Sequence, residues 1–145
     1  MKTFLTAGAI ALAACGLAAT PALAEHHEGD APEMTKGEKK LAKMLEGRVA
    51  GEPESCINTF TSGNLQIIDG TALVYKQGRT LWVNRTRNPE SLDDNDYLVI
   101  KKFGDASRLC RLDNVTTHDR GSNFFSGVVL LEDFVPYRLP DKAEG

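Results

Sequence analysis

Two adjacent histidines near the start of the chain could bind a metal ion. His26 and His27 follow Glu25 and come directly after the small-residue triplet Ala22-Leu23-Ala24. If the chain is cut after Ala24, His27 stands third from a free terminus. The terminal amine, two backbone amides and the His27 imidazole then offer Cu(II) or Ni(II) the planar set of nitrogens that these ions favour. The simpler interpretation, which we favour, is a polar tail whose histidines bind nothing.

The first 24 residues are typical of a secretory signal peptide. Lys2 precedes an apolar run from Phe4 to Ala19, and Thr20-Pro21 ends that run ahead of the small-residue triplet. The run is shorter than the roughly 20 residues that a membrane-spanning helix needs. We therefore expect cleavage after Ala24 and export to the periplasm or out of the cell. The mature chain should start with a flexible polar tail at residues 25–34.

The segment Leu12-Ala13-Ala14-Cys15-Gly16 raises an alternative, because it resembles the lipobox of bacterial lipoproteins. In such proteins the chain is cut before the cysteine, and a diacylglyceryl group on its sulfur anchors the protein to a membrane. The apolar run continues beyond Cys15 and a good cleavage triplet lies further on, so we favour cleavage after Ala24. Acylation of Cys15 would leave His27 inside the chain and remove the metal site.

The other two cysteines, Cys56 and Cys110, are expected to form a disulfide bond. Either fate of Cys15 leaves this even pair in an oxidising compartment, where disulfides persist. The bond would close a loop of about 55 residues and stabilise the fold by on the order of 4 kcal/mol through the entropy of the unfolded chain. Two buried free thiols are the alternative.

The segment Asp93-Asp94-Asn95-Asp96 concentrates carboxyl groups in one predicted loop. It lacks the turn glycine and the distal glutamate of a calcium-binding EF-hand loop. We interpret it as a solvated loop, with Arg85 and Arg87 as nearby partners for surface ion pairs.

His118, Asp119 and Ser122 could suggest a hydrolase. Adjacent residues of a strand point to opposite faces, so Asp119 cannot orient His118 as a catalytic triad requires. Ser122 lies in a predicted turn, and the chain contains no G-x-S-x-G, H-E-x-x-H or C-x-x-C motif. We therefore expect no catalytic residues and no enzymatic activity, with an enzyme of unrecognised type as the remaining alternative.

The aromatic residues Tyr75, Trp82 and Tyr97 could line a groove for a small apolar or sugar-like ligand. Large aromatic side chains on strands belong more often to the core. We favour the core interpretation and keep the groove as the alternative.

One short amphipathic helix is expected to position the start of the domain, over about residues 36–46. Thr35 and Glu38 fit a capping box, in which the threonine hydroxyl and the glutamate carboxylate bind free amides at the helix start. Apolar residues follow at helical spacing, and Gly47 is placed to end the helix.

From Ser55 onward the apolar residues alternate with a period of two, and turn motifs recur at short intervals. Strands spaced this closely must pair mostly as antiparallel hairpins. The fold class is therefore mainly β, on the border of α+β. We expect one domain at residues 35–145, with an antiparallel sheet or a partly open small barrel of about 5–7 strands. The expected strands are Cys56–Thr61, Leu65–Ile68, Thr71–Lys76, Thr80–Asn84, Tyr97–Phe103, Leu109–His118 and Phe124–Leu131.

The clearest hairpin turns at Gly78, which is free to adopt a positive φ. We expect Tyr75 on one face of this pair and Trp82 on the other. Because apolar residues occur on both faces, the helix should cover one face, and curling of the sheet toward a barrel should close the other.

Charge excludes some classes of partner. Removal of the first 24 residues leaves 121 residues with 16 basic and 20 acidic side chains, hence a net charge of −4. A mildly acidic chain with interspersed charges lacks the concentrated basic face that nucleic acids demand, and anionic membranes are disfavoured for the same reason. The expected partner is an envelope protein or a small ligand.

Four stretches carry a resemblance to a known group, namely Cys56-Ile57, residues 68–75, residues 81–85 and residues 108–113. Their pattern of two cysteines around β-hairpins is similar to that of small exported proteobacterial proteins of unknown function. The resemblance covers roughly residues 55–115, and this chain lacks the further cysteines of such proteins. The group supplies no activity or site residue to carry over. We expect a non-enzymatic envelope protein that binds a partner or a small ligand.

The metal hypothesis predicts that the processed protein starting at Glu25 binds Cu(II) tightly and that His27→Ala abolishes this binding. The reason is that the planar nitrogen set is incomplete without the imidazole. Isothermal titration measures the affinity, and circular dichroism checks that the fold is unchanged. Unaltered Cu(II) affinity in the variant would contradict the hypothesis, as would an intact mass that shows a diacylglyceryl group on Cys15.

Overall fold

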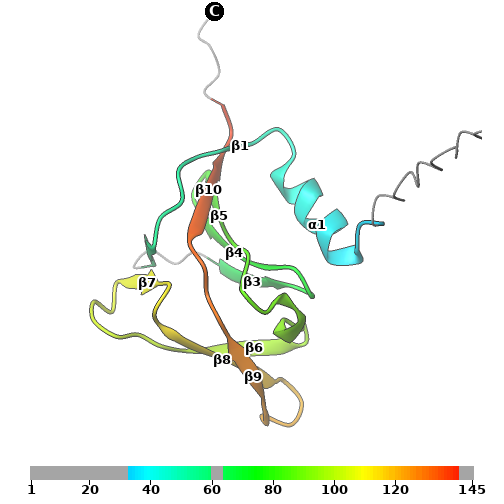
Figure 1. Cartoon of the computed structure of the whole chain (residues 1–145), viewed down its shortest axis with the longest axis vertical. Helices are drawn as coiled ribbons and strands as arrows, with labels where there is room; N and C mark the ends of the chain where they lie inside the picture. Colours follow the sequence, from blue (N-terminus) through cyan, green and yellow to red (C-terminus); the bar gives the residue numbers. More distant parts are fainter. Residues whose placement is uncertain (1–32, 60–63, 141–145) are drawn as a thin grey trace, which may run out of the picture. The chain divides into compact units, whose positions relative to one another are not determined.

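The computed structural model describes residues 33–59 and 64–140 (Figure 1). The predicted signal peptide, Cys15 and the Glu25, His26 and His27 motif lie outside the described residues.

The helix α1 spans Lys36–Leu45, as the capping and spacing predict. The Thr35 hydroxyl oxygen accepts a hydrogen bond from the Glu38 amide at 3.2 Å, which is one half of the capping box. The Glu38 carboxylate is bound elsewhere, as described below. Gly47 has a φ of 69° and follows the C-cap residue, so it ends the helix in the left-handed conformation.

Five strands form the largest sheet, and all of its neighbouring strands are antiparallel. Its order is β1-β10-β5-β4-β3. The strands are β1 (Val49–Ala50), β10 (Phe134–Arg138), β5 (Thr80–Asn84), β4 (Ala72–Gln77) and β3 (Asn64–Ile68).

The β4–β5 hairpin corrects the expected faces of its aromatic residues. Gly78 has a φ of 55° and forms a two-residue turn between Gln77 and Thr80. With two residues in the turn, each odd-numbered position of β4 lies opposite an even-numbered position of β5. Tyr75 therefore pairs directly with Trp82, and both side chains lie on the same face of the sheet, not on opposite faces.

Two smaller sheets complete the fold. One pairs β2 (Cys56–Asn58) with β7 (Arg108–Cys110), and the other has the order β6-β8-β9. The second contains β6 (Asp96–Lys101), β8 (Asn114–Asp119) and β9 (Phe125–Val129), and the 3-10 helix η1 (Pro89–Ser91) precedes β6.

The strand expected at Leu109–His118 is divided by a turn that the carboxylate of Asp113 stabilises. Asp113 accepts hydrogen bonds from the Cys110 and Phe103 amides, both at 2.8 Å, and its own amide donates to the Cys110 carbonyl at 3.0 Å. These hydrogen bonds hold residues 110–113 in a turn. Strand β7 therefore ends at Cys110, and β8 starts at Asn114.

Strand β10 lies beyond the last expected strand, which ended at Leu131, and it contains Pro136 although proline is uncommon inside a sheet. The Pro136 carbonyl accepts a hydrogen bond from the Gly51 amide at 2.7 Å, on the β1 side of the strand. The N–H and C=O of one strand residue point to the same side, so the missing N–H of Pro136 costs no bond to β5.

The mainly β class with one helix is confirmed. The described residues contain ten strands in three sheets, where fewer strands in one sheet or barrel were expected.

The predicted pairing of Cys56 with Cys110 is confirmed. Their sulfur atoms are 2.06 Å apart, and the two residues lie directly opposite each other in the β2–β7 pair. The Arg111 amide donates to the Ser55 carbonyl at 2.8 Å beside this bridge. The bond joins positions 54 residues apart in the sequence, which stabilises the fold by on the order of 4 kcal/mol in the chain-entropy description.

The five-stranded sheet separates two hydrophobic cores. Helix α1 covers one face, as expected, through Leu41, whose side chain is fully buried. The two smaller sheets cover the other face, so no closure into a barrel is needed. The first core contains Leu41, Ile68, Ala72, Val74, Leu81 and Val83, and the second contains Ile57, Ile67, Leu73, Tyr75, Trp82, Leu92, Leu109, Val115, Val129, Leu131 and Phe134.

Two asparagine side chains, one at the end of β5 and one four residues later, connect this part of the chain to the end of β9 and to the segment between β9 and β10. We call this arrangement the asparagine strap. The Asn84 side chain donates to the Glu132 carbonyl at 2.5 Å and accepts from the Glu132 amide at 3.1 Å. Asn88 donates to the Val128 carbonyl at 2.7 Å and accepts from the Leu130 amide at 2.8 Å. Each amide group thus satisfies one backbone donor and one backbone acceptor, as a neighbouring strand would.

Helix α1 is attached to the sheet at two further points. The Glu38 carboxylate accepts two hydrogen bonds from the Arg85 guanidinium, at 2.7 and 3.1 Å. Gly37 lies against the β3–β4 turn, where an added Cβ would overlap Thr71 Oγ1 and the Asp69 carbonyl. The hydrogen bond from Arg85 lowers the pKa of the Glu38 carboxyl from its ordinary value of 4.5.

The lowered pKa predicts how the stability contributed by Glu38 depends on pH. The contribution is present above the ordinary pKa near 4.5 and is lost as the pH falls through the lower pKa of the folded state. Glu38→Gln should therefore lower the free energy of unfolding by up to about 1 kcal/mol at neutral pH, since the pair is partly exposed, and by much less at pH about 2. Urea unfolding at both pH values measures the difference.

The matched control is Glu33→Gln, because the Glu33–Lys39 ion pair is exposed, with 93% of the Glu33 side chain accessible. This control should leave the free energy of unfolding unchanged at both pH values. An equal loss for Glu38→Gln at neutral and acid pH would show that the carboxylate charge does not contribute.

Candidate functional site

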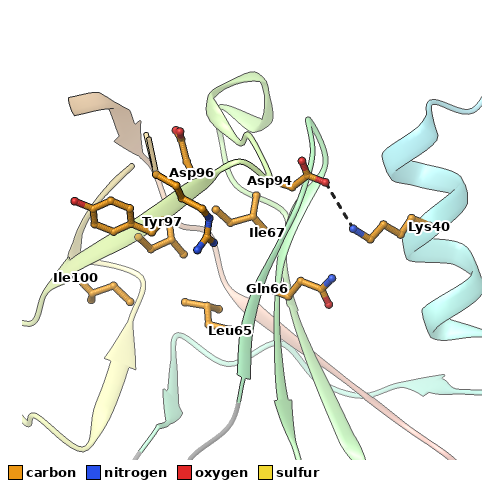
Figure 2. Close-up of a pocket in the computed structure, with 10 residues that line it drawn as sticks. Lys40, Leu65, Gln66, Ile67, Asp94, Asp96, Tyr97 and Ile100 are labelled. Carbon is orange, nitrogen blue, oxygen red and sulfur yellow. Dashed lines mark ion pairs between the residues drawn. The ribbon is translucent and has the colours of Figure 1, made fainter. Parts of the chain in front are cut away.

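A cavity with a volume of about 620 Å³ lies between β3 and β6. We call it the β3–β6 groove. Figure 2 shows Leu65 and Ile67 on one wall and Tyr97 and Ile100 on the other. The groove is lined by Lys40, Leu65, Gln66, Ile67, Asp94, Asp96, Tyr97, Leu98, Ile100 and Arg120.

Both walls of this groove are strand edges. Consecutive residues 65–67 of β3 and 96–98 of β6 line it. Side chains of consecutive strand residues point to opposite faces, so a cavity that reaches all of them faces the edge of the strand. The sheet order agrees, because β3 and β6 are each the last strand of their sheets and do not pair with each other.

The strand register indicates which backbone groups of β3 face the groove. In a two-residue hairpin the residues next to the turn, here Gln77 and Thr80, exchange hydrogen bonds. The odd-numbered residues of β4 therefore bond to β5, and the even-numbered ones bond to β3. Val74 is the partner of Gln66, so the amides and carbonyls of Leu65 and Ile67 point away from β4, toward the groove.

The floor of the groove is aliphatic and belongs to the second core. Leu65, Leu98 and Ile100 are partly buried and pack against that core. Ile67 is buried within it. The groove is therefore a seam where the core between two sheets is left open to solvent. An apolar side chain placed there would extend the core.

Charged groups of both signs lie on the rim. Lys40 Nζ is 3.9 Å from Asp94 Oδ2, and both side chains are about half exposed (Figure 2). Asp96 is only 4% exposed, and Arg120 adds a second cation. The rim therefore presents the cations of Lys40 and Arg120 and the exposed carboxylate of Asp94, which favours a ligand that carries charges of both signs.

The acidic segment was expected to pair with Arg85 and Arg87, and this is wrong. Arg85 binds Glu38, and Arg87 Nε binds Glu132 Oε1 at 2.5 Å. The distant helix α1 instead supplies the cation, Lys40, that pairs with Asp94. Sequence proximity to the arginines was misleading because the asparagine strap directs Arg87 toward Glu132.

The aromatic residues named as an alternative ligand groove do not line one cavity together. Tyr75 and Trp82 are 4% and 7% exposed and belong to the second core. The Trp82 indole N–H donates to Gln77 Oε1 at 3.0 Å, which satisfies its one polar atom. Of the three, Tyr97 alone lines the β3–β6 groove. The groove formed by all three is therefore corrected to two core residues and one groove residue.

His118, Asp119 and Ser122 have structural hydrogen bonds of their own. His118 Nε2 lies 3.2 Å from the Thr116 hydroxyl oxygen. Asp119 Oδ1 accepts bonds from the Ser122 amide and hydroxyl, both at 2.7 Å, and these bonds lower the pKa of the Asp119 carboxyl. The Ser122 hydroxyl thus donates to the Asp119 carboxylate and is part of the turn.

No group of three or more His, Cys, Asp or Glu side chains that could hold a metal ion occurs within residues 33–59 and 64–140. Nor does that part of the chain contain a helix long and apolar enough to cross a membrane. The Glu25, His26 and His27 motif is outside these ranges and remains a prediction.

Apart from Tyr97, the apolar groove residues were missed because the sequence does not show which strands end up at sheet edges. Leu65, Leu98 and Ile100 fit the expected strands as ordinary core positions. The available signal was the acidic segment at residues 93–96, which does mark the rim. Comparison with protein-family models, with curated protein sequences and with solved structures gave no match.

Proposed function

We propose that this protein is an exported, non-enzymatic binding domain that takes an extended polypeptide segment into the β3–β6 groove. The observation that carries this proposal is the pair of open strand edges facing one cavity. An extended peptide can add to such an edge and satisfy its free amides and carbonyls, while its alternate side chains enter the apolar floor.

Further features favour a peptide as the ligand. The inward-facing backbone groups of Leu65 and Ile67 can bind a peptide backbone independently of its sequence. The aliphatic floor selects apolar side chains at alternate positions. The charges of both signs on the rim suit a charged side chain or a chain terminus.

The location and the lack of catalysis rest on other observations. The amino-terminal segment typical of a signal peptide and the Cys56–Cys110 disulfide support export. The engagement of His118, Asp119 and Ser122 in local hydrogen bonds supports a non-catalytic role.

Selection from a phage-displayed library of linear peptides tests the proposal, with the selected peptides measured by isothermal titration. Leu65→Lys should weaken their binding by at least about tenfold, because a charge then lies in the apolar floor. Leu139→Lys is the matched control, since Leu139 is exposed, is not among the groove residues and should leave the affinity unchanged.

Backbone methylation of the selected peptides gives a second readout. A peptide that adds to the β3 edge alone should lose binding when N-methyl groups occupy one alternate set of residues and keep it when they occupy the other set. A peptide that lies between the β3 and β6 edges should lose binding with either set, because alternate amides face opposite edges. Failure to select any binding peptide would contradict the proposal. Equal affinity for wild type and Leu65→Lys would place the ligand elsewhere.

A further inference from the structure

We propose that the outer face of the β6-β8-β9 sheet is the contact surface of a homodimer. The face is built from rows of side chains that the register places side by side. Val99, Thr116 and Val128 form one row, and Tyr97, His118 and Phe125 form the next. The intervening residues of the same strands, such as Val115 and Val129, point the other way into the second core.

A β-bulge adds the second aromatic ring to this outer face. The register shifts between Thr117 and His118, so Phe125 lies opposite His118, where an unshifted ladder would place Ser126. The His118 ring consequently lies between Tyr97, with centroids 5.5 Å apart and rings stacked, and Phe125, at 5.8 Å in a T-shaped arrangement. The bulge thus places an apolar ring on a face that is open to solvent.

Exposed apolar side chains of this face can supply the apolar part of a dimer interface. Phe125 is 60% exposed, which amounts to on the order of 100 Å² for its side chain, and the partly exposed Tyr97, Thr116 and His118 of the same rows add to it. Val99, Val128 and Leu130 are each between 43% and 46% exposed and add on the order of 150 Å². A standard interface buries about 800 Å² per partner, of which a little over half is apolar.

Three polar side chains of the face have hydrogen-bond partners within the chain. The Thr116 hydroxyl is within hydrogen-bonding distance of His118 Nε2, at 3.2 Å, and the Tyr97 hydroxyl is 3.4 Å from Asn123 Oδ1. A sugar or a charged partner would need free donors and acceptors at this place. An apolar partner does not, because burying satisfied groups costs little.

A second copy fits this face because a two-fold interface sets each group near its own equivalent. Like charges near the axis would repel, and the rows that contain Val99 and His118 carry no carboxylate, lysine or arginine. Lys101 lies at the end of β6, with Nζ 5.9 Å from the Phe103 ring centroid.

The contact must be face to face, because the Asn88 side chain already binds the β9 edge at Val128 and Leu130.

Sedimentation analysis of the wild-type protein at about 1–100 μM tests the proposal, because an interface of this size gives dissociation constants within reach of that range. We expect a dimer. Val128→Lys and Val99→Lys should each raise the dissociation constant by at least about thirtyfold, since each introduces like charges across the two-fold axis.

Val49→Lys is the matched control, because Val49 is a 62% exposed strand valine outside the face, and its dimer should be as stable as that of the wild type. All three changed side chains are exposed, so circular dichroism should show an unchanged fold. A wild type that is monomeric throughout the concentration range overturns the proposal. Equal dissociation by Val49→Lys and Val128→Lys also overturns it, because the contact then does not depend on this face.

Discussion

The asparagine strap is the interaction on which the rest of the structure depends. Asn84 is completely buried, and its amide group binds both backbone polar groups of Glu132, while Asn88 does the same for Val128 and Leu130. The chain passes from the five-stranded sheet to the three-stranded sheet after β5 and returns after β9. Between these two passages the Arg87 amide donates to the Leu130 carbonyl at 2.8 Å, and the strap supplies four further hydrogen bonds. The second core can therefore be covered by separate sheets.

The groove and the exposed face both follow from this arrangement. A closed barrel would pair β3 with β6 and β1 with β9, and no edge would remain. Here the strap holds the two sheets together on one side of the second core, and the disulfide joins β2 to β7. The β3 and β6 edges are left unpaired, and the β6-β8-β9 sheet has one face in the core and one in solvent. The proposed peptide groove uses the edge of β6, and the proposed dimer uses its face.

Local features were predictable from the sequence because neighbouring residues determine them. The cap at Thr35, the end of α1 at Gly47 and the turn at Gly78 each depend on a single residue type in its usual position. The disulfide followed from counting cysteines. Strand β10 was missed. Whether Pro136 removes a hydrogen bond from the sheet depends on which neighbouring strand its backbone faces, and that is set by the sheet order. The groove was missed because edge positions depend on the sheet order, which rests on the strap.

Native-state hydrogen exchange of the Glu132 and Leu130 amides tests the role of the strap most directly. These amides donate to Asn84 and Asn88 and lie outside every strand. If the strap holds the sheets together, both amides exchange as slowly as those of the central strand β5, through opening of the whole domain. Exchange as fast as that of an exposed loop amide such as Glu90 would show that the strap opens locally, and would contradict its central role.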